Sequence, residues 1–194
     1  MKRPICTSVF ILCFALFLSL GASAGEGPAA LNKKTNTRNR VGEASGSMVH
    51  STDQKFTMDA ARSGRMEVQL GQTARQKASS AAVKELGKKI EQDHTQAGTG
   101  LAALAKAKNV PLPADAGGEK AMMDKMSSLS GTAFDKAYTK AMVSDHKKDG
   151  KEFEREAANG IDGDVKAFAA KMLPILREHL RIAEGLRRTV CNVR

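Results

Sequence analysis

Apolar residues recur at the spacing of an α-helix in four long segments of this chain. The expected helices cover about 53–77, about 80–108, about 132–159 and about 162–188. Residues three, four and seven positions apart fall on one face of a helix, so each segment presents a continuous apolar stripe. No segment shows the sustained two-residue alternation of a half-buried strand. The sequence therefore predicts an all-α protein in which four helices bury their stripes against one another.

The lengths of the connections predict how the helices are paired. Ser79-Ser80 and Asn159-Gly160 mark short breaks, so the first and last pairs of helices are each expected to form an antiparallel hairpin. The connection between the pairs is long, from Val110 to Gly131, with a short helix expected at 119–129. Two hairpins joined by one long crossover are the arrangement of ferritin-like four-helix bundles.

Helix boundaries have local signals of their own. Ser51 or Thr52 is the expected N-cap of the first helix, and Asp162 is the expected N-cap of the fourth. Residues 189–194 are expected to be a frayed tail. The predicted bundle domain is therefore 52–188.

The first 51 residues are expected to lie outside the bundle. A basic start, an apolar run at 9–20 and Ala22-Ser23-Ala24 form the three parts of a secretory signal peptide, predicted for residues 1–24. Its removal lowers the formal charge from +10 to +8. Residues 25–51 are rich in Gly, Ser, Asn and charge and follow no apolar period, which predicts a disordered tether. We expect an exported protein.

Several classes of protein are excluded by what remains after residue 24. No run of eighteen apolar residues follows, so no transmembrane segment is expected. Cys191 is the one cysteine left, which excludes a disulfide framework. Aromatic residues that stack on bases are few, which argues against a nucleic-acid partner. Basic helix faces are expected to be solvated, with weak contact to anionic envelope surfaces as the alternative.

Polar residues interrupt the apolar stripe of every long helix. Glu67, His94, His146 and His179 fall on the inward faces of four different helices, at about the same height in the bundle. Buried imidazole and carboxylate groups need partners, and in bundle interiors they build sites for transition metals such as zinc, copper or iron. Glu91 lies one turn before His94 and is a fifth candidate ligand.

Three acidic residues that precede the histidines are candidates to orient the imidazole rings: Asp93, Asp145 and Glu178. The alternative to a metal site is a buried, metal-free polar network in which Glu67 accepts from a histidine and the histidines bond to one another.

The same residues carry a family resemblance. The segment from about 53 to 188 resembles an exported bacterial ferritin-like family, catalogued as domain of unknown function 4142 and labelled periplasmic or outer-membrane protein. The matching elements are the helix of Glu67, the sequence 90–94, the sequence 134–138 leading to Asp145-His146, and the sequence 173–180 with Pro174 and His179. The resemblance implies a ferritin-like four-helix bundle with a metal-linked role, located in the periplasm or associated with the outer membrane.

This sequence departs from the pattern of two-iron ferritins. Leu176 stands where a second Glu-x-x-His motif needs its glutamate, and the third helix offers His146 in place of a glutamate. A single histidine-rich site is therefore the better inference than a two-metal ferroxidase.

Three hypotheses about function follow. The first is a non-catalytic bundle that binds one transition metal, for metal buffering or for protection of the envelope under stress. The second is a metal-free structural or interaction module of the envelope. The third is a residual oxidase or ferroxidase.

Overall fold

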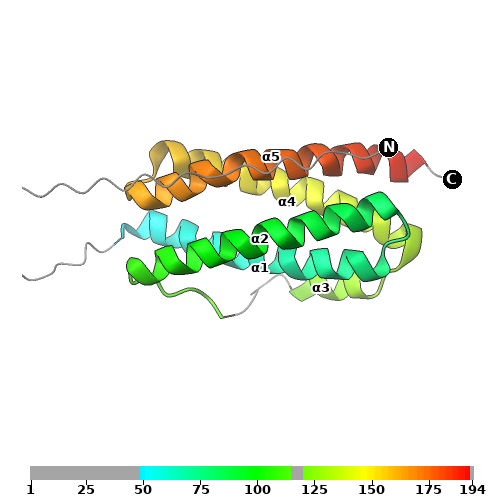
Figure 1. The fold of residues 1–194 in the computed structure, drawn as a ribbon, viewed down its shortest axis with the longest axis horizontal. Helices are drawn as coiled ribbons and strands as arrows, with labels where there is room; N and C mark the ends of the chain where they lie inside the picture. Colours follow the sequence, from blue (N-terminus) through cyan, green and yellow to red (C-terminus); the bar gives the residue numbers. More distant parts are fainter. Residues whose placement is uncertain (1–48, 115–119, 193–194) are drawn as a thin grey trace, which may run out of the picture. The chain divides into compact units, whose positions relative to one another are not determined.

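The computed structural model describes residues 49–114 and 120–192 and contains five helices in these ranges (Figure 1). They are α1 (Ser51–Lys77), α2 (Ala81–Ala107), α3 (Lys120–Ser127), α4 (Gly131–Asn159) and α5 (Gly163–Asn192). The described residues form no strand, only an isolated bridge between Ala78 and Gly131. The all-α prediction is confirmed. The predicted signal peptide and most of the predicted tether lie outside the described residues.

The four long helices are paired as two hairpins. α1 packs along α2 and α4 packs along α5, while α1 also contacts α4 and α2 contacts α5. Figure 1 shows that the α1–α2 turn and the start of α4 lie at one end of the bundle, and that the α4–α5 turn lies at the other. The connection between α2 and α4, which carries α3, therefore returns along the length of the helices.

A carboxylate from each hairpin binds the turn of the other hairpin. Asp135 in α4 accepts hydrogen bonds from the backbone N–H of Ser79 at 3.1 Å and of Ser80 at 2.9 Å. Asp53 in α1 accepts from the backbone N–H of Ile161 at 2.9 Å and of Asp162 at 2.5 Å. Both carboxylates are buried. Since free turn N–H groups are costly to bury, these contacts hold the two hairpins together at both ends.

The helix N-termini differ in one place from the prediction. Ser80 and Asp162 accept from backbone N–H groups in the first turns of α2 and α5, as expected. α1, however, begins at Ser51, and its N-cap is His50, whose ring nitrogen accepts from the Thr52 N–H at 3.4 Å. The expectation of Ser51 or Thr52 as the cap was wrong, because an imidazole nitrogen can take the same acceptor role.

The C-terminal boundaries show what ends each helix. α2 ends through Asn109, which adopts a left-handed backbone with φ of 54°, while the Val110 N–H donates to the Ala105 carbonyl at 2.8 Å. α5 continues through Asn192, so most of the predicted frayed tail is helical. Val190 is buried in the core, and this packing explains why the helix extends beyond residue 188.

The core consists of two apolar clusters. The first cluster lies around the α1–α2 turn and includes Leu70, Ile90, Phe134, Met142 and Ala183. The second cluster lies toward the α4–α5 turn and includes Phe56, Phe153, Val165, Met172 and Leu176. On every long helix the residues of one cluster lie before a buried polar residue and those of the other lie after it, except for Met66, which directly precedes Glu67. The clusters therefore enclose a polar layer in the middle of the bundle.

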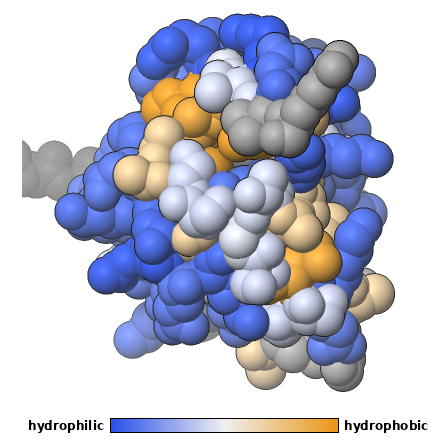
Figure 2. All heavy atoms as spheres, turned by 90° about the vertical axis from the view of Figure 1, so that its right-hand side faces the viewer, coloured by the Kyte–Doolittle hydropathy of each residue, from blue (hydrophilic) through white to orange (hydrophobic). Residues whose placement is uncertain are grey.

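The surface is mainly polar. Seen end-on from the side of the α1–α2 turn, hydrophilic side chains surround a few apolar ones (Figure 2). Among the described residues, Ile161 is the large hydrophobic side chain that stands exposed. No helix in the described ranges combines the length and the hydropathy that crossing a lipid bilayer requires.

Candidate metal centre

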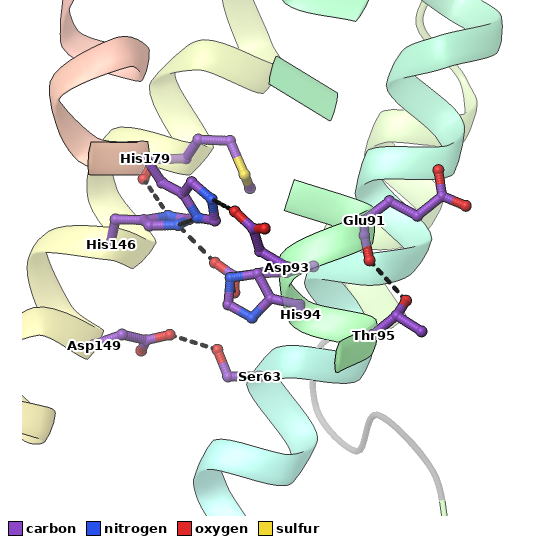
Figure 3. Close-up of polar contacts among 10 residues, drawn as sticks. Ser63, Glu91, Asp93, His94, Thr95, His146, Asp149 and His179 are labelled. Atoms are coloured by element: carbon purple, nitrogen blue, oxygen red, sulfur yellow. Dashed lines mark hydrogen bonds and ion pairs between the residues drawn. The ribbon is translucent and has the colours of Figure 1, made fainter. Parts of the chain in front are cut away.

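The polar layer brings together one side chain from each long helix. Glu67 of α1, His94 of α2, His146 of α4 and His179 of α5 are all buried, with exposed fractions of 7% or less. One nitrogen from each of the three histidines lies within 4.8 Å of the others. Figure 3 shows the three rings facing one another between the helices. The residues that the sequence places on four separate stripes thus meet in one place.

The contacts in this layer form a closed ring through the four helices. Glu67 places Oε2 at 2.9 Å from His94 Nε2 and Oε1 at 3.2 Å from His146 Nδ1. His146 Nε2 lies 3.1 Å from His179 Nδ1. His179 Nε2 lies 2.8 Å from Asp93 Oδ2, which returns the ring to α2. We call these five residues the polar ring.

Three of the buried atoms are close to partners but make no hydrogen bond of acceptable geometry. They are both carboxylate oxygens of Glu67 and Nε2 of His94. Their short distances are therefore ion-pair contacts, and their lone pairs or protons are directed elsewhere. Buried polar atoms without a hydrogen bond cost about 1–3 kcal/mol each, which makes them a mark of a missing partner.

His146 and His179 carry too few ring protons for the contacts that their nitrogens make. His146 Nδ1 faces two acceptors, Glu67 Oε1 and the Met142 carbonyl at 3.1 Å, and His179 Nε2 faces the Asp93 carboxylate. The two rings also face each other. These three contacts require three ring protons, whereas two neutral imidazoles carry two. A further proton or another cation is needed to satisfy the ring.

Burial and charge act in opposite directions on the carboxylate. Burial alone would raise the pKa of Glu67, but the nearby rings of His94, His146 and His179 outweigh it and lower the pKa to about 2. Glu67 is therefore an anion at neutral pH, as a metal ligand must be.

The histidines divide into two kinds. Burial lowers the pKa of His94, but the Glu67 carboxylate outweighs burial, and the net pKa is raised. Burial lowers the pKa of His146, and it lowers the pKa of His179 to about 4. These last two rings are neutral at pH 7. They are in the state that binds a metal ion, and neither supplies the third proton that the polar ring needs.

One predicted ligand does not join the site. Glu91 accepts from Arg75 Nη1 at 2.8 Å and from Gln72 Nε2 at 3.3 Å, on the outer side of the α1–α2 hairpin. Figure 3 shows its side chain directed away from the histidines. Glu91 lies three positions before His94, so its side chain points about 60° away from that of His94 around the helix axis. In that direction it meets the basic side chain of Arg75. The prediction of Glu91 as a fifth ligand was wrong.

Of the three acids expected to orient the rings, one does so. Asp93 bonds His179 from across the bundle, not its neighbour His94. Glu178 is exposed and pairs with Arg181 at 2.7 Å. Asp145 is partly buried, and its Oδ2 has no hydrogen-bond partner. Neither Glu178 nor Asp145 contacts a histidine ring, so these two predictions were wrong.

The structure adds a buried acid that the sequence reading missed. Asp149 lies beside the polar ring and accepts from the Ser63 hydroxyl at 2.6 Å (Figure 3). Burial, reinforced by the charge of Glu67, raises the pKa of Asp149 to about 7. A sequence signal existed: Asp53-x-x-Phe56-Thr57 and Asp135-x-x-Tyr138-Thr139 repeat one pattern. Asp149 follows the second copy at the same distance as Glu67 follows the first.

Two glycines fix the spacing of the helices that carry Glu67 and His94. A Cβ on Gly71 would lie 2.5 Å from the Gly87 carbonyl oxygen, and one on Gly87 would lie 2.6 Å from the Ala74 Cβ. α1 and α2 therefore touch backbone to backbone one turn from Glu67. This close approach allows the carboxylate of one helix to reach the imidazole of the other.

Comparison with known proteins supports the family resemblance. Neither the curated proteins nor the solved structures include a match to the chain. The ferritin-like assignment and export therefore stay predictions. The family model described as domain of unknown function, DUF4142, matches residues 39–186, which covers the whole polar ring. The chain belongs to the DUF4142 family.

Proposed function

We propose that this protein binds one transition-metal ion through Glu67, His94, His146 and His179. The observation that carries the proposal is the cation deficit of the polar ring: three contacts around His146 and His179 require three protons on two neutral imidazoles. A metal ion bound to the rings supplies the missing positive charge. It also gives a partner to the buried atoms of Glu67 and His94 that lack a hydrogen bond.

The distances support a site for a small ion with nitrogen and oxygen ligands. Two nitrogens that are each ~2.0–2.1 Å from a zinc ion lie roughly 3.3 Å apart in tetrahedral geometry. His146 Nε2 and His179 Nδ1 lie 3.1 Å apart. The three histidine nitrogens all lie within 4.8 Å of one another, a spacing that one small ion can bridge. Three imidazoles and a carboxylate suit zinc, copper or iron.

The residues around the polar ring support a non-catalytic site for a single ion. Leu176 is buried in the second apolar cluster, where a second glutamate of a two-metal site would be needed. We therefore propose that the protein buffers a transition metal or protects the cell envelope from one, after export with its predicted signal peptide.

Mass determination of the protein from its native host is expected to give a chain that begins at Gly25; a chain that begins at Met1 would contradict export.

The test of metal binding is the metal content of protein purified without a histidine tag. The wild type, loaded with zinc and passed over a desalting column, is expected to retain about one ion per chain. The double variant with His94→Ala and His146→Ala is expected to retain almost none. His50→Ala is the matched control: His50 is the exposed N-cap of α1 and is not part of the polar ring, so this variant is expected to retain the ion. Near-zero metal in the wild type would refute the proposal.

A second candidate function is a metal-free structural module. The observation that favours it is that the His179–Asp93 and His146–His179 contacts already connect three helices without an ion. In that case an added proton takes the place of the metal. A chelator that leaves the melting temperature of freshly purified protein unchanged, together with absence of bound metal, would favour this alternative.

A further inference from the structure

A cavity of about 600 Å³ lies beside the polar ring. Glu67, His94, Ser63 and Asp149 line its inner end. Exposed residues of α1 and α2, among them Gln69 and Thr99, also line it, so the cavity opens to the surface between these two helices. Its volume is in the range of pockets that hold small organic molecules.

The walls of the cavity are mainly apolar. Leu101 of α2, Phe153 of α4, and Phe168, Met172 and Leu176 of α5 line it together. Apolar walls around a few convergent polar groups are the usual composition of a small-molecule site. A molecule that fills this space would bury an apolar body against these side chains and direct one end toward Glu67 and His94.

The inner end favours a negatively charged group once a metal is bound. A divalent ion held by the Glu67 carboxylate and three neutral imidazoles leaves one net positive charge, because the Asp93 carboxylate beside His179 is balanced by Lys89 at 3.0 Å. A buried net positive charge favours an anionic partner. Both Glu67 oxygens and His94 Nε2, the atoms without a hydrogen bond, belong to residues that line the cavity. Asp149, whose pKa is raised to about 7, offers a protonated carboxyl there for part of the population at neutral pH.

We propose that this cavity binds a small organic monocarboxylate with an apolar body, whose carboxylate binds the metal ion as an exchangeable ligand. This inference rests on the proposed metal binding. His146 and His179 do not line the cavity, so the ligand would approach the ion from the side of Glu67 and His94 only.

The test uses the full mature chain loaded with cobalt(II), whose visible spectrum reports its ligands. Cobalt uptake is measured first and separately. Decanoate is then added, and the expected result is a saturable change of the cobalt bands. Acetate, which lacks the apolar body, is expected to need at least about tenfold higher concentration. Decanol, which lacks the charge, is expected to leave the bands unchanged.

Glycine variants locate the binding to this cavity. Gly64 lines the inner end, where its Cβ would lie 3.7 Å from His94 Nδ1, and Gly98 lines the α2 side with open space around it. Gly64→Leu and Gly98→Leu are each expected to weaken the response to decanoate by about tenfold or more. Gly185→Leu is the matched control, because Gly185 is helical, has open space around it and lies outside the cavity.

The outcomes separate this inference from the proposed function. A wild type that binds cobalt but shows no spectral response to decanoate overturns the inference and leaves metal binding intact. A response that both cavity variants retain at wild-type strength also overturns it. Absence of cobalt uptake refutes the proposed function, and the inference with it.

Discussion

Glu67 is the residue on which the polar ring depends most. It is fully buried, it contacts histidines from two other helices, and its pKa is lowered to about 2. A carboxylate in an apolar core is stable only if positive or proton-donating groups surround it. In the metal-free protein His94, whose pKa is raised, supplies that charge.

Glu67→Gln is therefore expected to lower the stability of the metal-free protein by about 3–5 kcal/mol at pH 6, because His94 loses its buried counter-charge. Denaturant unfolding in the presence of a chelator measures this change. Glu184→Gln is the matched control: Glu184 pairs with Lys147 on the surface, where solvent screens the pair, and its loss is expected to change the stability little. Equal effects of the two substitutions would contradict the role given to Glu67.

Asp149 has the opposite electrostatic character. Its folded pKa of about 7 lies above the ordinary value of 3.8, so the native state holds a proton on this carboxyl that the unfolded chain releases. The stability linked to this proton is fully present below the unfolded pKa and is lost as the pH rises through about 7. Wild-type stability is therefore reduced at alkaline pH by this one group.

Asp149→Asn tests that assignment, since an amide keeps an acceptor for the Ser63 hydroxyl and carries no charge. In chelator-treated protein we expect the variant to match the wild type near pH 4 and to be more stable by about 1–3 kcal/mol at pH 8. Thermal unfolding at both pH values measures this. A variant that is less stable than the wild type at pH 8 would show that the carboxyl is ionised and favourably paired.

At the residue scale, the buried polar side chains that interrupt an apolar stripe could be predicted from the sequence. The contacts of the acids that precede the histidines could not. Residues next to each other on a helix point about 100° apart, so the acid that precedes a histidine cannot face the same ring. Asp145 and Glu178 fail for this reason. Asp93 succeeds because it points toward α5 and meets His179, a contact that depends on packing between helices.

At the scale of elements, the close contact between α1 and α2 positions the site. Gly71 and Gly87 bring the backbones together one turn from Glu67, and the cavity opens beside Glu67 and is lined by residues of the same two helices. A side chain at either glycine would force the helices apart.

Gly87→Ala is expected to destabilise the protein by about 1–3 kcal/mol despite the higher helix propensity of alanine, because the new methyl group meets Ala74 and the Gly71 carbonyl. It is also expected to weaken zinc binding by separating Glu67 from His94. Gly185→Ala, which meets no atom within 4 Å, is expected to be neutral or stabilising by up to about 1 kcal/mol. Denaturant unfolding and zinc titration of both variants provide the measurement, and a stabilised Gly87→Ala would contradict the close packing.

The helices themselves were largely predictable, because their period and breaks are local properties of the sequence. The boundaries of α2 and α4 differ from expectation by a residue or so, and Ser80 and Asp162 cap as predicted. The contacts of Asp53 and Asp135 with the opposite turns could not be read from one helix at a time. The contacts of Asp53 join residues 108 and 109 positions apart, and those of Asp135 join residues 56 and 55 positions apart. Only their repeated pattern hints at them.

At the scale of the whole molecule, the polar ring is the one layer of the described core in which all four long helices contact one another through polar atoms. Apolar clusters lie on both sides of it, and the two turn-binding carboxylates hold the hairpins in register. A ligand that binds only this assembled layer stabilises the folded state by mass action.

Zinc is therefore expected to raise the stability of the wild type by about 2.7 kcal/mol at a concentration one hundred times its Kd. His179→Ala is expected to lose most of this gain, and Glu178→Ala, at the adjacent exposed position, is expected to keep it. Thermal unfolding with and without zinc measures the difference. A gain of equal size in both variants would place the ion elsewhere on the protein.

The measurement that tests the central claim most directly is a crystal structure of the zinc-loaded protein with anomalous data at the zinc edge. Our account predicts one strong anomalous peak within the bundle, with nitrogens of His94, His146 and His179 and an oxygen of Glu67 at ~2.0–2.2 Å. Zinc bound only at surface residues, with the polar ring unchanged, would contradict it.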